Sequence, residues 1–308
     1  MVKIINRSNI LTEKINPKSE MIDAMGTEEI IRLINEEDGT VHLAVREVIP
    51  EITKAVDLVV EAFKNGGHLR YFGAGTSGRL GVLDASEIPP TFSASPEMVQ
   101  GMIAGGWKAL RKAVEGAEDY PENGKKDCKA INLQPNDVVM GIATGGTTPY
   151  VHGALKYAKS LGCKTVFFTC TPKEGLGVEE DVDVFIEVLV GPELITGSTR
   201  MKAGTATKMV LNMMTTTAMI KMGKVYGNYM IDHQAINSKL VDRGTRIIAT
   251  LTGLSYDDAY QALLAADKHV KDAVVMVKKN VSLEKARELI SEHDGFIRFA
   301  FEESDKQV

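Results

Sequence analysis

The stretch Tyr71–Glu87, YFGAGTSGRLGVLDASE, decides the fold of this chain. It starts with an apolar run typical of a buried strand, continues through three glycines in a GxGxxG pattern, and passes into a helical segment. The glycines are Gly73, Gly75 and Gly78. A strand that turns into a helix through such a loop presents backbone N–H groups to an anion at the helix N-terminus. We therefore predict an α/β fold with an anion-binding turn after this strand.

Short apolar runs alternate with helical segments between residues 68 and 190, which predicts a mostly parallel sheet with helices on both faces. Ahead of this region, residues 27–64 carry apolar side chains three and four positions apart, as helices do. A long apolar helix is expected after Gly197, followed by short charged helices. The five predicted strands are the runs HLRYFG, EMVQGMIAGG, NDVVMGIA, CKTVFFTC and VDVFIEVLV.

These patterns divide the chain into three predicted segments: N-terminal helices over residues 1–64, a ligand-binding sheet domain over 65–237, and a small helical domain over 238–308. The sequence Asn-Gly-Gly that opens the second segment predicts the end of the preceding helix, because glycine readily terminates helices. In the third segment, Ser255 is expected at the N-cap of a helix with acidic residues in its first turn.

The composition excludes several classes of protein. The chain has 308 residues, of which 44% are hydrophobic and 25% charged, as in a globular protein with a substantial core. A net charge of -5 supplies no basic field for nucleic acid. The three cysteines lack CxxC spacing, which argues against a disulfide framework or a zinc ribbon. Since no apolar run approaches the roughly 20 residues of a membrane span, we expect a cytoplasmic protein that binds neither nucleic acid nor membranes.

The glycine loop has two candidate ligands. A dinucleotide would need an acid at the end of the next strand, but Glu97 precedes that strand, and the helix is expected to end near Pro89 and Pro90 after only about ten residues. A monophosphate fits better, because backbone N–H groups and the hydroxyls of Thr76 and Ser77 offer several donors to one compact anion.

Two further turns repeat this chemistry. The turn ATGGTTP after the third predicted strand is again rich in glycine and hydroxyls, and two hydroxyls open the long helix. Because the carboxyl ends of parallel strands form the binding crevice of an open sheet, all three turns should meet there. The alternative is that their hydroxyls only cap helices and turns. The candidate ligand-binding residues are Gly75, Thr76, Ser77, Gly78, Thr144, Gly146, Thr147, Thr148, Ser198 and Thr199.

Carboxylates are the candidates for acid/base chemistry. Glu87 is predicted at the end of the glycine-loop helix, where the negative end of the helix dipole should disfavour its ionised form, as suits a general acid. A solvated surface glutamate is the alternative. Glu115, Glu118 and Asp119 are predicted at the end of a helix that begins near Trp107, and their spacing does not choose among them. The six histidines lack metal-ligand spacing, so metal-free chemistry is expected.

Several longer motifs resemble those of the N-acetylmuramic acid 6-phosphate etherase family, which belongs to the sugar isomerase (SIS) domain group. The similarity extends from LTEKINPKS near the N-terminus to residue 243. The motifs are GAGTSGRLGVLDASEIPPTF, VQGMIAGG, AVEGAED, VGPELITGSTRMKAGTATKMVLNMMTT and KVYGNYMIDHQAINSKLVDR.

The resemblance implies a three-layer, Rossmann-like SIS domain that binds a sugar phosphate at the three turns, without cofactor or metal. It implies a lyase of cell-wall recycling, which converts N-acetylmuramic acid 6-phosphate into N-acetylglucosamine 6-phosphate and D-lactate. The family's proton donor corresponds to Glu87, and its second active carboxylate corresponds to Glu118 rather than Glu115. The resemblance further implies a homodimer with its sites near the subunit interface.

The chain departs from the family in its second turn, where Gly145 replaces a serine and Thr147 replaces an arginine. Two other functions stay open. A sugar-phosphate isomerase would begin with the same deprotonation at C2 but would return the proton to C1. A sensor of sugar phosphates, such as the related glucokinase regulatory protein, would need no pair of carboxylates.

Overall fold

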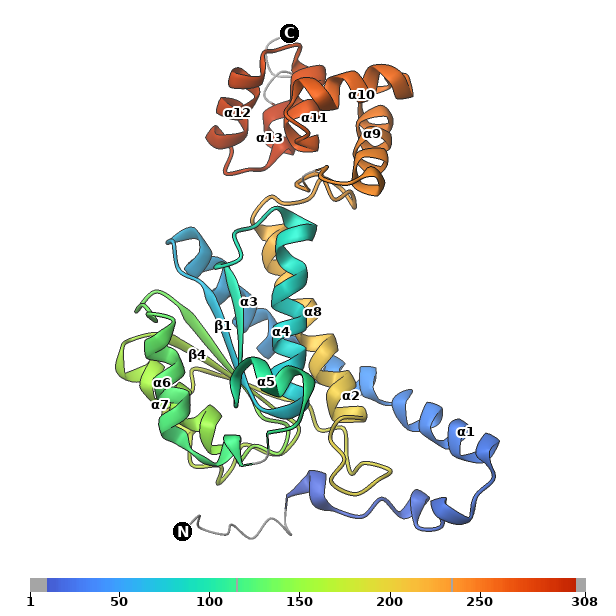
Figure 1. Cartoon of the computed structure of the whole chain (residues 1–308), viewed down its shortest axis with the longest axis vertical. Helices are drawn as coiled ribbons and strands as arrows, with labels where there is room; N and C mark the ends of the chain where they lie inside the picture. Colours follow the sequence, from blue (N-terminus) through green and yellow to red (C-terminus); the bar gives the residue numbers. More distant parts are fainter. Residues whose placement is uncertain (1–9, 115, 234, 303–308) are drawn as a thin grey trace. The chain divides into compact units, whose positions relative to one another are not determined.

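The computed structural model describes residues 10–114, 116–233 and 235–302 (Figure 1). These residues form two compact units. Within the described ranges, the first unit takes in 10–86 and 97–215, and the second takes in 87–96 and 216–302. The division predicted from the sequence into 1–64, 65–237 and 238–308 stays a prediction.

A five-stranded sheet forms the centre of the first unit, and every pair of neighbouring strands is parallel. The predicted α/β fold with five strands is thereby confirmed. The order across the sheet is β2-β1-β3-β4-β5. The strands are β1 (Leu69–Gly73), β2 (Val99–Ile103), β3 (Val138–Ile142), β4 (Lys164–Thr169) and β5 (Val184–Glu187).

Helices precede the sheet, connect its strands and form the second unit. The helical region predicted over residues 27–64 is split at Gly39 and Val48 into three helices. Among the described helices, none combines the length and the apolar character that a membrane crossing requires. The helices are α1 (Thr27–Asp38), α2 (Val41–Glu47), α3 (Ile49–Lys64), α4 (Gly75–Phe92), α5 (Gly106–Arg111), α6 (Pro121–Ala130), α7 (Pro149–Ser160), α8 (Lys202–Lys221), α9 (Ser238–Thr252), α10 (Tyr256–Ala265), α11 (Val270–Lys279), α12 (Leu283–Glu292) and α13 (Ile297–Glu302).

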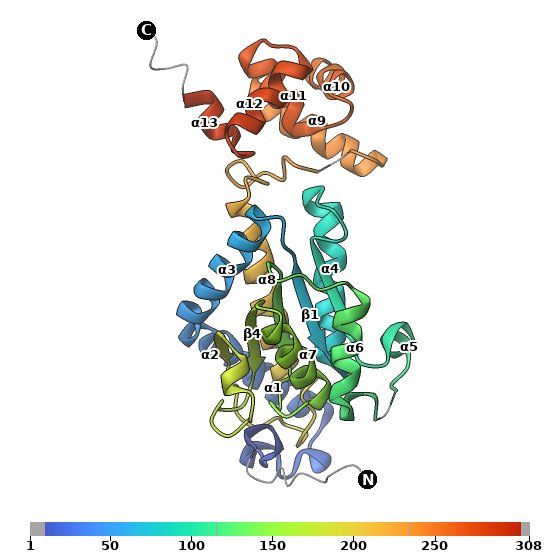
Figure 2. The ribbon, with the colours of Figure 1, turned by 90° about the vertical axis from the view of Figure 1, so that its left-hand side faces the viewer.

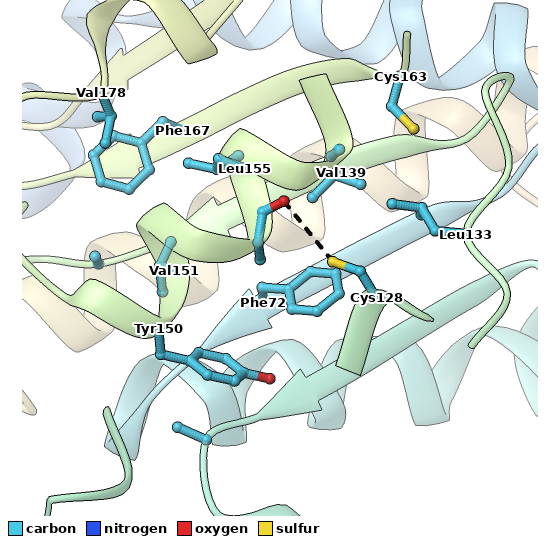
Figure 3. Close-up of a cluster of buried hydrophobic side chains, with 14 residues drawn as sticks. Phe72, Cys128, Leu133, Val139, Tyr150, Val151, Leu155, Cys163, Phe167 and Val178 are labelled. Atoms are coloured by element: carbon cyan, nitrogen blue, oxygen red, sulfur yellow. Dashed lines mark hydrogen bonds between the residues drawn. The ribbon is translucent and has the colours of Figure 1, made fainter. Parts of the chain in front are cut away.

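Helices α6 and α7 lie side by side against one face of the sheet (Figure 2). Figure 3 shows the apolar core on this face, where side chains of β1, β3 and β4 pack against α7. The Cys128 thiol from α6 donates to the carbonyl of Ala154 at 3.8 Å. The side chains labelled in this cluster are Phe72, Cys128, Leu133, Val139, Tyr150, Val151, Leu155, Cys163, Phe167 and Val178.

The other face of the sheet carries a buried polar network that joins three elements. The Tyr71 hydroxyl of β1 donates to Asp84 of α4 at 3.0 Å. Asp84 also accepts hydrogen bonds from Asn212 and Thr215 of α8, at 3.1 and 3.2 Å. Burial raises the pKa of Asp84, and the three hydrogen bonds partly oppose that rise. Asp84 is therefore a structural carboxylate, although it lies in the same DASE motif as Glu87.

The prediction that α4 ends at Pro89 and Pro90 is wrong. The helix continues through both prolines to Phe92. Each proline removes one backbone donor, but its fixed φ is compatible with a helix, so the chain can continue in helical geometry when its environment supports it. Glu87 therefore lies inside α4 and before its last turn. The helix dipole acts mainly within the last turn, so it does not mark Glu87 as a general acid.

The N-terminal segment is fastened to the first unit by a buried ionic cluster. Glu37 accepts from the ammonium groups of Lys202 at 2.7 Å and Lys18 at 2.8 Å, and from the Asn16 amide at 3.1 Å. The Asn16 amide also donates to the Pro192 carbonyl at 3.2 Å. The Lys202–Glu37 and Asn16–Pro192 contacts join residues more than 160 positions apart. The first holds α1, and the second holds the segment before α1, whose only regular elements among the described residues are short 3₁₀ turns.

The second unit has a core of its own, formed by apolar side chains of α9 to α13. Its helix α10 begins as predicted, because the Ser255 hydroxyl accepts a hydrogen bond from the backbone N–H of Asp258. This cap satisfies one of the free donors at the helix N-terminus.

Candidate active site

A pocket of about 290 Å³ lies in the first unit, at the carboxyl ends of β1 and β3. The chain runs from β1 to β2 on one side of β1 and then crosses to β3 on the other side, so the switch point of the sheet lies between β1 and β3. Ligands of such sheets bind outside this point. The pocket is lined by Ile10, Thr12, Glu13, Ala74, Gly75, Thr76, Ser77, Glu118, Ile142, Ala143, Thr144, Gly145, Thr147, Thr148, Gly197 and Thr199.

The glycine loop forms a tight turn from β1 into α4. A β-carbon on Gly73 would lie 2.7 Å from the nitrogen of Gly78, so this close approach requires glycine. Gly75 adopts a φ of +52°, in the left-handed region. Gly75, Thr76 and Ser77 line the pocket, whereas Gly78 does not. The first N–H groups of a helix lack partners within it, and together with the helix dipole they favour an anion there.

The second turn holds its shape through its own backbone and a histidine. Gly146 has a φ of +76°, and its N–H donates to the Ala143 carbonyl at 2.8 Å. The Gly146 carbonyl lies 2.7 Å from Nε2 of His152 on α7. Thr148 is the N-cap residue of α7, but its side chain makes no capping hydrogen bond. Thr144, Thr147 and Thr148 line the pocket, whereas Gly146 shapes the turn from outside it.

In the third turn, Glu193 caps the following helix in place of the predicted hydroxyls. Helix α8 begins at Lys202, after the predicted hydroxyls. The Glu193 carboxylate accepts hydrogen bonds from the N–H groups of Lys202 and Ala203, each at 3.0 Å. Burial raises the pKa of Glu193, and these hydrogen bonds counteract it. Thr199 lines the pocket, and Ser198 does not.

Glu118 is the predicted catalytic carboxylate that lines this pocket. It lies in a 3₁₀ turn, Ala117–Asp119, and not at the end of a longer helix as predicted. Helix α5 already stops at Arg111, and Gly116 has a φ of +73°, which interrupts a right-handed helix. Glu115 lies outside the described residues. Glu87 belongs to the second unit, has an exposed side chain, and is not among the residues that line the pocket.

Comparison with known proteins fixes the family. The chain is 51% identical to N-acetylmuramic acid 6-phosphate etherase 2 of Vibrio parahaemolyticus serotype O3:K6 (strain RIMD 2210633), over 96% of this chain and 98% of the relative. It is 52% identical to N-acetylmuramic acid 6-phosphate etherase of Salinibacter ruber (strain DSM 13855 / M31), over 96% and 94%. The chain belongs to the N-acetylmuramic acid 6-phosphate etherase family.

Broader similarities agree with the SIS fold. Residues 51–159 match the N-terminal SIS domain family of the glucokinase regulatory protein. A structure from Bacteroides fragilis NCTC 9343, described as a phosphosugar isomerase involved in capsule formation, superposes with a TM-score of 0.50 at 21% identity. It covers 68% of this chain and 98% of the other. At this low identity the likeness shows the fold alone.

The N-terminal segment contributes pocket residues that the sequence reasoning missed. Ile10, Thr12 and Glu13 line the pocket of this etherase-family protein, as do Gly145 and Gly197. No periodicity or local motif placed the segment there, because its position depends on contacts made far along the chain. The one available signal was the motif LTEKINPKS, which is part of the family resemblance but carried no assigned role.

The thiols do not provide a nucleophile. Cys128, Cys163 and Cys170 are buried and free. Burial raises the pKa of Cys128 to about 12 and that of Cys163 to about 11, and it raises the pKa of Cys170 as well. A thiol with a raised pKa is protonated near neutral pH and reacts poorly. In the described part of the chain, histidines, cysteines and carboxylates do not gather into a cluster that could bind a metal ion.

Proposed function

We propose that this protein is a lyase that cleaves the D-lactyl ether of N-acetylmuramic acid 6-phosphate, giving N-acetylglucosamine 6-phosphate and D-lactate in the recycling of cell-wall amino sugars. The observation that carries this proposal is a sequence identity of 51% and 52% to two named etherases, over nearly their whole length. The pocket supports it, since anion-binding turns and a carboxylate line the same cavity.

The first two turns offer the best hydrogen-bond donors for the phosphate group of the substrate. The N-terminus of α4 offers backbone donors from Gly75 to Ser77 and the positive end of a helix dipole. Thr144 and Thr148, which both carry hydroxyls, line the same pocket. A volume of about 290 Å³ is at the lower end of the range for small-molecule sites, which suits one phosphorylated sugar.

The elimination of the lactyl group requires two proton transfers. In the ring-opened sugar, the C1 aldehyde acidifies the C2 proton, which a carboxylate removes. The C3–O bond then breaks, and the departing lactyl oxygen takes a proton from an acid. Water adds across the resulting C2=C3 double bond, with its hydroxyl on C3 and its proton on C2. We assign these transfers to Glu118, which lines the pocket, and to Glu87, which the family resemblance indicates.

We further propose a cytoplasmic homodimer, in line with the family resemblance. Mixing inactive Glu87→Gln and Glu118→Gln variants tests whether the two carboxylates of one site come from one chain or from two. With exchange of subunits in a dimer, activity regained to about a quarter of the wild-type value assigns them to two chains. No regained activity, with exchange demonstrated by a tag on one variant, assigns them to one.

Release of D-lactate from N-acetylmuramic acid 6-phosphate is the direct test of the function. The purified protein, treated with a chelator, is expected to release one D-lactate for each N-acetylglucosamine 6-phosphate formed. An isomerised sugar phosphate without D-lactate would contradict the proposal in favour of an isomerase. Binding of the sugar phosphate without any product would contradict it in favour of a sensor.

Restoring the family's arginine is expected to strengthen substrate binding. Thr147 lines the pocket, and Thr147→Arg would add a fixed positive charge beside the anionic substrate. We expect KM to fall by about tenfold, corresponding to one charge-assisted hydrogen bond of roughly 1.4 kcal/mol. Steady-state kinetics measure this, with Thr147→Gln as a control of similar length without charge. An unchanged KM in both variants would show that other donors already satisfy the anion.

A further inference from the structure

Thr12 combines deep burial with an unsatisfied hydroxyl. Thr12 is only 1% exposed, and it lines the pocket. Within the described residues, its Oγ1 atom is buried and has no hydrogen-bond partner. A buried hydroxyl without a partner destabilises the folded protein, so it is rarely retained without a purpose.

The segment that carries Thr12 closes the pocket between two of the ligand turns. A β-carbon on Gly145 would lie 3.7 Å from Thr12 Oγ1. Glu13, the residue after Thr12, lies near the third turn: a β-carbon on Gly197 would lie 3.2 Å from one of its carboxylate oxygens. Thr12 therefore faces the turn that follows β3, while Glu13 faces the turn that precedes α8. An anionic group would avoid the Glu13 carboxylate and sit on the side of Thr12.

Tertiary contacts keep Thr12 in this position. Four residues later, Asn16 is held by Glu37 and the Pro192 carbonyl. The Ser19 hydroxyl donates to the Leu194 carbonyl at 2.7 Å. The chain after Leu194 continues to Gly197 and Thr199, which line the pocket. The segment is thus anchored close to the site, and little entropy remains to be lost when the Thr12 hydroxyl meets a ligand.

We propose that Thr12 is a substrate-binding residue whose hydroxyl donates a hydrogen bond to the phosphate group of the bound sugar. That the ligand is this sugar phosphate rests on the function proposed above. That the Thr12 hydroxyl lacks a partner among the described residues is independent of that function. The hydroxyl's own partner would then be a phosphate oxygen on the Gly145 side of the pocket. The alternative is a purely structural residue, whose methyl group fills the wall and whose hydroxyl has no part in binding.

Two substitutions at Thr12 separate these roles. Thr12→Val keeps the shape and removes the hydroxyl, while Thr12→Ser keeps the hydroxyl. We expect Thr12→Val to raise KM for N-acetylmuramic acid 6-phosphate about tenfold, and the inhibition constant of inorganic phosphate about equally, with kcat changed less than about threefold. Thr12→Ser should restore both constants to within about threefold of the wild type. Equal constants in Thr12→Val and wild type would overturn the proposal.

The melting temperature gives a readout that does not depend on turnover. Without ligand, Thr12→Val should melt no lower than the wild type, because it removes no hydrogen bond. Inorganic phosphate should raise the melting temperature of the wild type and of Thr12→Ser, and raise that of Thr12→Val much less. This result would stand even if the protein released no D-lactate, so the two proposals can fail separately. An equal phosphate-induced shift in all three proteins, or a rise in KM without any change for phosphate, would overturn the phosphate contact.

Thr165 provides the matched control. It is 0% exposed, like Thr12 it has a buried hydroxyl, and it lies at the start of β4, away from the carboxyl ends of the strands. Its hydroxyl donates to Asp183 at 2.9 Å and accepts from the Asp183 N–H at 3.1 Å. Thr165→Val should therefore lower the melting temperature and leave the constants for substrate and phosphate unchanged. A lowered melting temperature of unliganded Thr12→Val, as in this control, would show an internal partner and overturn the proposal.

Discussion

Replacing Glu118 by glutamine is expected to reduce D-lactate release by about a thousandfold, the usual scale for loss of a general acid or base. Glutamine has nearly the same shape, but its amide neither takes up nor delivers a proton at neutral pH. Glu118 lines the pocket from the 3₁₀ turn Ala117–Asp119, and glutamine keeps the size of its side chain. The measurement is kcat, together with the melting temperature and the binding of inorganic phosphate, both of which should be preserved.

Asp119 is the matched control for this substitution. It is the next residue of the same turn and is not among the residues that line the pocket. Asp119→Asn should therefore keep kcat within about threefold of the wild type.

Glu87→Gln should resemble Glu118→Gln if Glu87 carries the other proton transfer. Full activity of either glutamate variant would remove that residue from the mechanism.

The substitution Lys202→Met is expected to lower the free energy of unfolding by about 3–5 kcal/mol, the usual cost of breaking a buried ion pair from one side. Lys202 and Glu37 have side chains only 4% and 7% exposed, and they meet at 2.7 Å. Without the ammonium group, the partners that Glu37 keeps among the described residues are Asn16 and Lys18, and Lys18 has a side chain that is 63% exposed. Denaturant titration measures the loss as a lower midpoint at an unchanged slope.

An exposed ion pair provides the contrast. Arg32 and Glu28 meet at 2.6 Å on the surface of α1, with side chains 71% and 78% exposed. Since water screens such pairs, Arg32→Met should leave the unfolding midpoint nearly unchanged. Equal losses in the two variants would contradict the view that burial makes the Lys202–Glu37 pair important.

The same ion pair should be visible in the acid stability of the protein. Burial by itself would raise the pKa of Glu37, but hydrogen bonds from Lys18 and Lys202 outweigh it and lower the pKa from 4.5 to about 2. A carboxylate with a lowered pKa stabilises the fold at pH values above 4.5, and this contribution is lost as the pH falls towards 2. The difference in stability between wild type and Lys202→Met should therefore shrink over this range. A constant difference would contradict the assignment.

The sheet was predictable because its strands are short, buried apolar runs between helical segments. The central strands β1, β3 and β4 are almost completely buried, so apolar side chains mark them without reference to distant parts of the chain. The glycine loop was predictable for a similar reason, since Gly73 and Gly75 serve a backbone geometry that few other residues allow. The turn after β3 followed the same local logic.

Features that depend on distant contacts were not predictable. Pro89 and Pro90 suggested a helix end, although α4 continues through them. The helical spacing of Glu115 and Glu118 suggested a shared helix face, although α5 ends at Arg111 and Glu118 lies in a separate 3₁₀ turn. Thr12 lies in a segment without periodicity, and it reaches the pocket only because Asn16 and Ser19 are bonded to residues more than 170 positions away.

Thr12 lies close enough to Gly145 for a side chain at position 145 to meet its hydroxyl. Gly145 has room for a small side chain, because an added β-carbon would meet only the Thr12 oxygen at ordinary contact distance. A serine at this position could take up the Thr12 hydroxyl as its own partner and present a second hydroxyl in its place. We therefore expect the two positions to change together. A change at either should persist in a lineage only when the other accommodates it, so ligand preference in these proteins can drift through an N-terminal residue that no local motif marks.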